Sequence, residues 1–487
     1  MAYIGERIRE TAENYPNRIA IKSGDESITY ESFYQFSRLL QEKIQSIYPN
    51  GKGRKIGFML ANGPTWLEVF IAISQSGDIA LPFDPKWSDS QLENVIDDAQ
   101  PDLIIYDHSF VQRLEGLQGA VLVDDLFKHS SERGAAGPLS DKDPFYIGYT
   151  SGTTGQPKGF VRSHASWANC FSRGRDVFSI DASQQILCPG PLVHSHFLYA
   201  AVQALHIGAS LHLQPSFDAE EALQLINKEE IAVMYIVPTM FEAVKRVKGV
   251  QNLSSLTTMI SSGAKWPTSS KKEALQLFPQ ASLYEFYGAS ELSFVSYRLI
   301  HETTIDKESI GTPFPEVEIS ILREDGEPAE HGEVGQLYVK SPWVFDGYLN
   351  RPEETKQVFH GEWATVGDLA FIDEEGQIIL KGRKQNMIIS GGLNIYPEEV
   401  EQVILTHPAI QEAVVKGIED DYWGEKVVAF VKVNKGNSLN FEDLKNLLIS
   451  KIPKYKCPKE WVELDEFPYT SSGKIARKEL VIPSRRD

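Results

Sequence analysis

The chain has 487 residues, of which 42% are hydrophobic and 24% are charged. This length and composition exclude a single small module and a disordered or fibrous protein, and predict about two to four folded domains. Asp and Glu total 67 against 48 Lys and Arg, and the resulting net charge of −19 disfavours nucleic acid and anionic membrane surfaces as partners.

The cysteines and the N-terminal sequence indicate the cellular compartment in which the protein is found. Cys170, Cys188 and Cys457 are too few and too widely spaced for a disulfide framework or a metal site. The charged N-terminal sequence MAYIGERIRE lacks the apolar centre of a secretory signal, and no apolar segment reaches the length of a membrane span. We therefore expect a cytoplasmic protein.

Short apolar runs alternate with amphipathic stretches through the first half of the chain. Strands are expected at 55–60, 79–84 and 101–107, with helices between them at 65–77 and 90–99. This alternation predicts a largely parallel sheet with crossover helices. Because the pattern resumes at 221–247 and 256–288, the sequence predicts two α/β halves before residue 300.

The pattern changes near residue 310. Residues 317–341 contain two alternating runs around an Asp-Gly turn, which predict an antiparallel hairpin or a small barrel, and a further pair of runs follows at 364–383. The last part of the chain predicts an α+β domain of roughly 100 residues, a common domain size. The expected fold is therefore α/β: residues 1–383 form a large N-terminal domain of two α/β halves and a small β subdomain, and residues 384–487 form a small α+β domain.

The segment YTSGTTGQPKGF at 149–160 is rich in glycine and hydroxyl residues and follows an apolar strand. Small residues let backbone N–H groups turn toward an anion, and Lys158 adds a positive charge, so the segment suits a polyphosphate. The spacing of Gly152, Gly155 and Lys158 does not fit a P-loop. Taken alone, the segment is also compatible with a mobile linker.

Further motifs show that this loop does not stand alone. They are PLVHSHF (191–197), SSGAKWP (261–267), YGASE (287–291), TVGD (365–368), GRKQNMIISGGLNIYPEEVE (382–401) and SSGKIARKEL (471–480). Together with the loop, and in this order, they resemble the motifs of the adenylate-forming superfamily, which comprises acyl- and aryl-CoA synthetases, adenylation domains of peptide synthetases, and luciferases. The resemblance covers nearly the whole chain. It implies an enzyme that joins a carboxylic acid to AMP at the expense of ATP and then transfers the acyl group to a thiol.

The resemblance implies roles in nucleotide binding for most of the motif residues. The loop that grips the β- and γ-phosphates comprises Thr150, Ser151, Gly152, Thr153, Thr154, Gly155 and Lys158. Backbone contacts to the adenine are implied for Gly263 and Ala264, and the YGASE motif supplies Tyr287, Gly288, Ala289, Ser290 and Glu291. Tyr287 would stack near the adenine and Ser290 would bind the α-phosphate. Glu291 would hold Mg²⁺, an ion that proteins often bind through one carboxylate beside phosphates.

The C-terminal motifs imply ribose binding, catalysis and a hinge. Asp368 and Arg383 resemble the ligands of the ribose hydroxyls, and Lys474 the lysine that neutralises charge developing on the α-phosphate. By itself, a lysine near a terminus is usually a solvated side chain. The hinge departs from the family pattern, because Gln385 stands where Asp or Lys is common. A rotation there would exchange Lys474 for the Gly391-Gly392 turn, which lines the thiol tunnel in the family.

The motif residues narrow the choice of the acid substrate and of the thiol acceptor. His194 resembles the histidine that gates the acyl pocket in coenzyme A ligases. The segment around it has no aspartate to pair with an amino acid's ammonium group, and Phe286 stands where malonate-type enzymes have an arginine. The candidate pocket residues are apolar: Phe197, Trp266, Phe286, Leu292 and Phe294. Core packing is an equally good explanation for each of them.

These features predict an acyl-CoA synthetase for a fatty or aryl monocarboxylic acid, with ATP, Mg²⁺ and coenzyme A as cofactors. A standalone enzyme that loads a carrier protein stays open as an alternative, and so does a homodimer. A non-catalytic nucleotide-binding relative also stays open, although such a protein is expected to have lost Lys474 or Glu291, and both are present.

Overall fold

The computed structural model describes residues 3–47, 52–128, 139–150, 157–249, 253–305, 308–420, 422–434, 436, 439–470 and 475–482. The chain divides into two compact units, Met1–Glu318 with Val339–Ala364, and Ile319–Tyr338 with Thr365–Asp487. The domain boundary predicted from the sequence, between Arg383 and Lys384, stays a prediction. None of the described helices is long and apolar enough to cross a membrane.

In the first unit, the described residues form a nine-stranded sheet with the order β15-β14-β13-β12-β11-β9-β10-β1-β2. Its strands are β1 (Ile19–Ser23), β2 (Glu26–Thr29), β9 (Gln185–Cys188), β10 (Ser210–Leu213), β11 (Val233–Ile236), β12 (Thr258–Ser261), β13 (Ser282–Ala289), β14 (Ser293–Ile300) and β15 (Thr312–Pro313). The central pairs, from β1–β10 through β12–β13, are parallel, whereas β13 and β14 form an antiparallel hairpin.

A second sheet of this unit contains, within the described ranges, seven strands in the order β18-β8-β7-β4-β3-β5-β6. They are β3 (Lys55–Met59), β4 (Ile79–Pro82), β5 (Leu103–Tyr106), β6 (Ala120–Leu122), β7 (Pro144–Thr150), β8 (Lys158–Ser163) and β18 (Gly347–Tyr348). The parallel strands β3, β4 and β5 confirm the three strands expected from apolar runs at 55–107. At one edge of this sheet, β8 pairs antiparallel with both β7 and β18.

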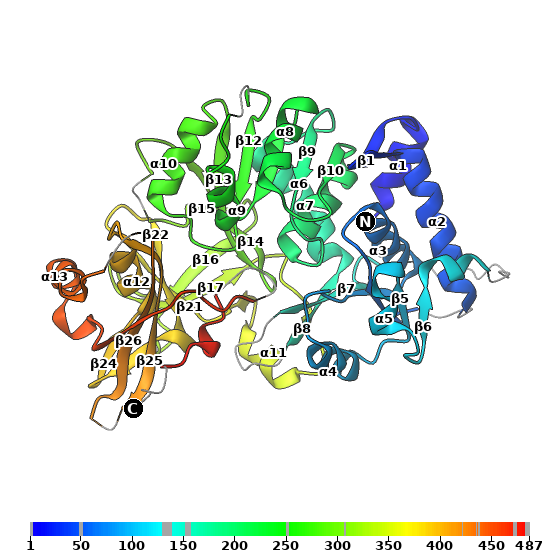
Figure 1. The fold of residues 1–487 in the computed structure, drawn as a ribbon. Helices are drawn as coiled ribbons and strands as arrows, with labels where there is room; N and C mark the ends of the chain where they lie inside the picture. Colours follow the sequence, from blue (N-terminus) through cyan, green and yellow to red (C-terminus); the bar gives the residue numbers. More distant parts are fainter. Residues whose placement is uncertain are drawn as a thin grey trace. The chain divides into compact units, whose positions relative to one another are not determined.

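Helices connect these strands as the periodicity predicts. Those of the first unit are α1 (Glu6–Asn14), α2 (Tyr30–Ile47), α3 (Pro64–Ser76), α4 (Asp89–Ala99), α5 (Val111–Leu114), α6 (His164–Phe178), α7 (Ser195–Ile207), α8 (Ala219–Lys228), α9 (Pro238–Val244), α10 (Thr268–Leu277) and α11 (Pro352–Val358). The start of α4 shows the local cause, because Ser88 and Gln91 form a capping box that satisfies two free N–H groups of the first turn. Figure 1 places α11 beside β8.

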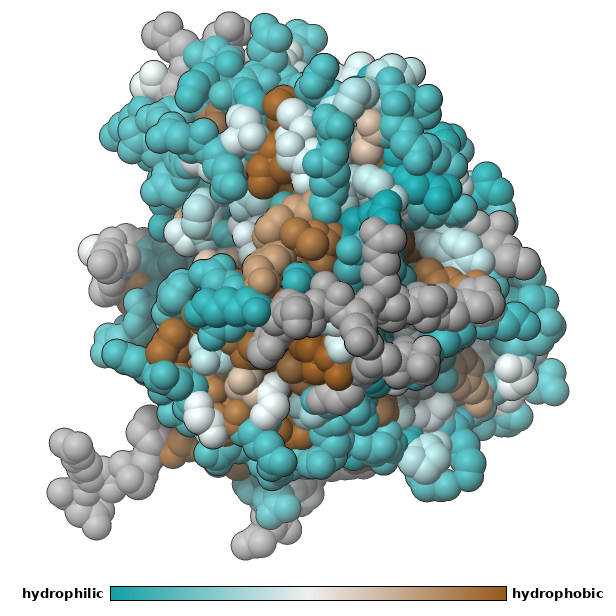
Figure 2. All heavy atoms as spheres, turned by 90° about the vertical axis from the view of Figure 1, so that its right-hand side faces the viewer, coloured by the Kyte–Doolittle hydropathy of each residue, from teal (hydrophilic) through white to brown (hydrophobic). Residues whose placement is uncertain are grey.

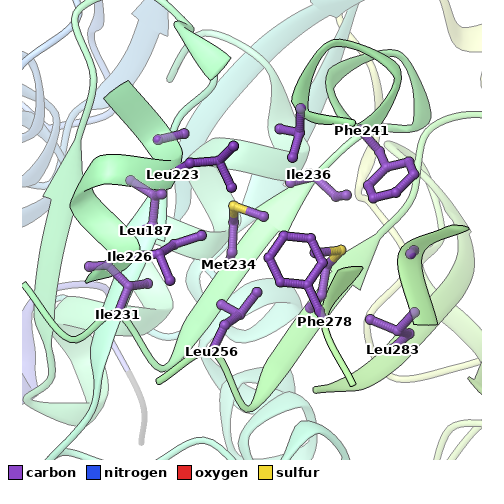
Figure 3. Packing of buried hydrophobic residues seen from close by; sticks show 14 of the residues in the cluster. Leu187, Leu223, Ile226, Ile231, Met234, Ile236, Phe241, Leu256, Phe278 and Leu283 are labelled. Atoms are coloured by element: carbon purple, nitrogen blue, oxygen red, sulfur yellow. The ribbon is translucent and has the colours of Figure 1, made fainter. Parts of the chain in front are cut away.

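The core of the nine-stranded sheet explains why its strand β11, with the sequence VMYI, is apolar at every position. Met234 and Ile236 of β11 face Leu223 and Ile226 of α8 in one buried cluster, which also contains Phe241 (Figure 3). The intervening residues of β11 are buried as well, since helices cover both faces of a parallel sheet. At the surface, the face in Figure 2 is largely hydrophilic, in keeping with the charged composition.

The second unit is built mainly on antiparallel strands. One group has β16 (Glu318–Leu322), β17 (Gly335–Lys340), β21 (Asp368–Ile372) and β22 (Ile378–Arg383), in which β16 pairs with β17 and β21 pairs with β17 and β22. The described part of the other group has five strands, β23 (Ile388–Ser390), β24 (Leu393–Ile395), β25 (Ile410–Asp420), β26 (Gly424–Val433) and β27 (Glu460–Glu463), with helices α12 (Pro397–Leu405) and α13 (Phe441–Lys451). The pair β26–β27 is parallel. The expected small β region and the α+β end of the chain are both confirmed.

Candidate active site

The β13–β14 hairpin carries the YGASE motif. Ser290 and Glu291 occupy its turn, and Tyr287 lies near the end of β13. Gly288 is required there, because any Cβ would collide with the carbonyl oxygen of Ser293 on the opposing strand. The register of the hairpin shifts between Tyr287 and Gly288, because Val295 on the opposing strand has no pairing partner there.

Glu291 is fixed by a segment that follows it by more than fifty positions in the sequence. Its backbone carbonyl accepts a hydrogen bond from the N–H of Phe345 at 2.8 Å, and its Oε1 atom accepts one from the hydroxyl of Tyr348 at 2.7 Å. Among the residues that the structure describes, no group of three or more His, Cys, Asp or Glu side chains could hold a metal ion. A lone, oriented carboxylate fits Mg²⁺, which keeps most of its waters when it binds beside phosphates.

The β7–β8 hairpin carries the predicted phosphate loop. Thr150 and Lys158 are opposite each other at the loop end of the hairpin, and residues Ser151, Gly152, Thr153, Thr154 and Gly155 lie outside the described residues. The ammonium group of Lys158 contacts the carboxylate of Glu354 and lies 5.6 Å from the centre of the Tyr348 ring. Tyr348 therefore contacts the predicted metal ligand and the predicted phosphate ligand at once.

A hydrogen-bonded group of side chains holds this hairpin close to its loop. The hydroxyl of Tyr149 donates to Asp98 at 2.8 Å, and Asp98 also pairs with Arg351 at 2.9 Å. Burial, together with the neighbouring Asp98 carboxylate, raises the pKa of Tyr149 well above its usual value. Tyr149 thus stays a neutral donor and anchors β7 directly before the loop.

A buried arginine joins the two hairpins. Arg162 of β8 is 1% exposed, and it donates to the carbonyl of Trp343 at 2.8 Å and to the hydroxyl of Ser293. Burial lowers the pKa of this guanidinium group to about 10. Ser293 directly follows the YGASE turn and has a left-handed backbone with φ of 58°. The Arg162 side chain therefore links the strand that begins at Lys158 to the turn that holds Glu291.

The predicted adenine contacts follow β12. Gly263 has φ of 88°, a conformation that favours glycine, and it precedes the exposed Ala264. Ser262 donates a hydrogen bond to the carbonyl of Phe286 at 3.0 Å, which fastens this loop to β13 just before Tyr287. Since the carboxyl ends of parallel strands share one edge of a sheet, the loop and Tyr287 lie on the same edge.

His194 precedes α7, and its Nε2 atom lies 4.0 Å from Oδ2 of Asp84. Asp84 is 3% exposed and follows β4. The sequence analysis missed this carboxylate. Its position just after a parallel strand, where ligands commonly bind, was the available signal.

The candidate acyl-pocket residues divide into two groups. The ring of Phe286 lies 4.8 Å from that of Phe294 and 5.6 Å from that of His196, and Phe197 packs directly against Gly190. Trp266, by contrast, belongs to the buried cluster that also contains Met234 and Leu223, and its ring lies 5.3 Å from that of Phe241. For Trp266, core packing is therefore the correct explanation, whereas the phenylalanines form an aromatic group next to the YGASE hairpin.

The second unit brings Asp368 and Arg383 together. They are opposite each other in the β21–β22 hairpin, with 3.2 Å between Nε of Arg383 and Oδ1 of Asp368. Gln385 is exposed in a short 3-10 turn at Lys384–Asn386. Lys474 lies outside the described residues.

The Gly391-Gly392 turn joins β23 to β24. Both residues have positive φ, 59° and 78°, and the N–H of Gly391 donates to the carbonyl of Trp423 at 2.8 Å. Its backbone is therefore one that a side-chain-bearing residue would strain.

Comparisons with known proteins agree with the motifs. The AMP-binding enzyme family matches residues 8–349, and the AMP-binding enzyme C-terminal domain matches residues 399–474. The uncharacterized acyl-CoA ligase YhfT of Bacillus subtilis is 39% identical over 96% of both chains. The putative long chain fatty acid-CoA ligase VraA of Staphylococcus epidermidis is 30% identical, covering 99% of this chain and 98% of its own. The solved o-succinylbenzoate coenzyme A synthetase of Bacillus subtilis, in complex with ATP and magnesium ion, is 27% identical with a TM-score of 0.89 and covers 97% of this chain and 98% of its own.

Proposed function

The chain belongs to the AMP-binding enzyme family, and from this premise we propose that it is an ATP-dependent acyl-CoA synthetase for an apolar monocarboxylic acid. The observation that supports this most directly is the meeting of Lys158 and Glu291 at Tyr348. One ammonium group and one carboxylate, carried by two hairpins, suit the phosphates of ATP and their Mg²⁺. ATP, Mg²⁺ and coenzyme A are the cofactors of this reaction.

The reaction has two steps. An oxygen of the acid attacks the α-phosphorus of ATP and pyrophosphate leaves, after which the thiol sulfur attacks the acyl carbon and AMP leaves with that oxygen. Reactions of this kind require the protein mainly to position groups and to stabilise charge. Lys158 and the loop before it would hold the terminal phosphates, and Ser290 and Lys474 the α-phosphate. Glu291 would hold Mg²⁺, which would supply positive charge beside the phosphates.

The remaining site residues would bind the nucleoside and prepare the site for the second step. Tyr287 and the Gly263-Ala264 backbone would contact the adenine, and Asp368 with Arg383 would bind the ribose hydroxyls. Rotation near Gln385 would replace Lys474 by the Gly391-Gly392 turn for thiol attack.

An apolar acid is favoured by the aromatic group around Phe286 and Phe294. One relative, a putative ligase, is named for long-chain fatty acids, which are apolar monocarboxylic acids, and a solved neighbour is named for o-succinylbenzoate, an aryl acid with a second carboxylate. Asp84, beside His194, is a carboxylate that could instead attract an acid with a positively charged group, such as an amino acid. Fatty and aryl acids are therefore the first substrates to test, and amino acids the contrast.

ATP–pyrophosphate exchange with a panel of carboxylic acids tests the proposal. Each buried methylene contributes about 0.8 kcal/mol, so kcat/KM should rise several-fold per added carbon until the pocket is full. Acetate, malonate and amino acids should support little exchange. Vigorous exchange with an amino acid would overturn the apolar pocket. Exchange with a fatty acid, but no use of free coenzyme A, would move the assignment to a carrier-loading enzyme.

The proposal also includes the compartment and the oligomeric state of the enzyme. We place it in the cytoplasm, where the three buried cysteines would stay as thiols. A homodimer is the assembly that light scattering of the purified protein should detect.

A further inference from the structure

Tyr348 contacts both charged groups that the proposed function assigns to ATP and Mg²⁺ in the first unit. Its hydroxyl donates to Oε1 of Glu291 at 2.7 Å, and the Lys158 ammonium lies 5.6 Å from its ring centre, within the range of a cation–π contact. The residue is in neither the YGASE motif nor the phosphate loop. It reaches them from the short strand β18.

The backbone of Tyr348 is fixed on the strand that begins at Lys158. Gly347 and Tyr348 pair antiparallel with Val161 and Phe160 of β8, and the next residue, Leu349, donates its N–H to Gly159 at 2.7 Å. Tyr348 and Lys158 therefore share one rigid piece of sheet.

The turn into α11 holds the other side of Tyr348. The N–H of Tyr348 donates to the hydroxyl of Thr355 at 2.9 Å, and Gly347, with φ of 136°, lies so close to Thr355 that a Cβ would come within 2.8 Å of its methyl group. The Phe345 ring packs against the Tyr348 ring at 4.9 Å between centres. These contacts fix the backbone of Tyr348 and one side of its ring, and the hydroxyl donates to Glu291.

We propose that Tyr348 is a positioning residue that orients the Glu291 carboxylate for Mg²⁺ while its ring face supports Lys158. The inference rests on the proposed function. A phenol suits this task better than a lysine or arginine would, because it fixes the carboxylate by a hydrogen bond without neutralising the charge that attracts the metal. A glutamate side chain loses considerable rotamer freedom when it is held in one place, and this loss costs free energy. Because Tyr348 already holds Glu291, the cost does not fall on metal binding.

Tyr348→Phe tests the inference, because it removes the hydroxyl and keeps the ring beneath Lys158. The readout is the affinity of the protein for ATP, measured by calorimetry without Mg²⁺ and with saturating Mg²⁺. We expect the strengthening of ATP binding by Mg²⁺ to fall about tenfold, the size of one hydrogen bond to a charged group. ATP affinity without Mg²⁺ should be unchanged. Tyr3→Phe is the matched control, since it removes a tyrosine hydroxyl that donates to the Leu139 carbonyl in the same unit.

The same measurement in a Glu291→Gln background separates positioning from a general loss of structure. If Tyr348 acts through Glu291, then Tyr348→Phe should have no further effect there. An equal effect in both backgrounds, or an unchanged Mg²⁺ dependence in the single variant, would overturn the inference. If instead the wild-type protein binds ATP equally well with and without Mg²⁺, the metal role proposed for Glu291 fails, and the role of Tyr348 fails with it.

Discussion

The two units hold their proposed active-site groups in different ways. In the first unit, Glu291 and Lys158 are each fixed by the 345–354 segment, which binds both hairpins through backbone and side-chain contacts. In the second, Asp368 and Arg383 mainly hold each other across one hairpin, and the Gly391-Gly392 turn lies on short strands. The difference suits the proposed division of labour. The first unit would hold the phosphates and Mg²⁺, and the second would supply the ribose ligands together with Lys474 and the Gly391-Gly392 turn, which replace each other between the steps.

The sharpest test of this division is Lys474→Ala. The variant should lose about 10²–10³ in the rate of adenylate formation, the usual effect of removing one electrostatic stabiliser. Thioester formation from a supplied acyl-adenylate should be largely intact, because the lysine acts where charge grows on the α-phosphate. Rapid-quench assays of each half-reaction measure this, with Lys478→Ala as the control. Equal losses in both steps would contradict the division.

The anchoring of the chain beyond Lys474 gives a stability prediction. Arg477 forms two contacts with Glu401, at 2.6 and 2.7 Å, and Glu401 also accepts the N–H of Val415. Because Glu401 is buried and Arg477 is partly exposed, Arg477→Met should destabilise the second unit by about 2–3 kcal/mol. Urea unfolding should show this loss, and Lys445→Met, which breaks an exposed pair with Glu442, should change little. If Arg477→Met lowers the free energy of unfolding as little as the control does, then Arg477 does not anchor this part of the chain.

Gln385→Pro tests the place of the hinge. Proline fixes φ near −65° and restricts the residue before it, so one orientation of the C-terminal part should be trapped. Adenylate should still form, and transfer to coenzyme A should slow by about tenfold or more. Gln385→Ala, which keeps the backbone freedom, should behave like the wild type. Unimpaired transfer in the proline variant would place the hinge away from residue 385.

The smallest expected effect concerns Glu354. Its carboxylate contacts the Lys158 ammonium and would compete with an ATP phosphate for it. Glu354→Gln should therefore lower KM for ATP about two- to fivefold, as expected for one partly exposed ion pair. Glu353→Gln, which removes the exposed partner of Lys356 on the same helix, should leave KM unchanged. If the two variants have the same KM, the Lys158–Glu354 pair does not compete with ATP.

These comparisons also show what the sequence could and could not predict. The strands β3, β4 and β5 were predictable because burial imposes a local pattern of apolar residues. The motif order indicated Glu291 and Lys158, but the hydroxyl that orients Glu291 comes from Tyr348, which no local pattern connects to it. The same holds for Asp84 beside His194, and for Trp266, whose apolar character fits a core and a pocket equally well.

The central claim is that the acid passes through an acyl-adenylate, and oxygen labelling tests it most directly. A carboxylic acid that supports exchange is labelled with ¹⁸O in both carboxyl oxygens and incubated with the protein, ATP, Mg²⁺ and coenzyme A, and the products are analysed by mass spectrometry. Because the acid's oxygen attacks the α-phosphorus and leaves with it, AMP should gain one ¹⁸O atom and pyrophosphate none, with one acyl-CoA formed for each AMP. Label in pyrophosphate or orthophosphate, or unlabelled AMP beside acyl-CoA, would contradict the account.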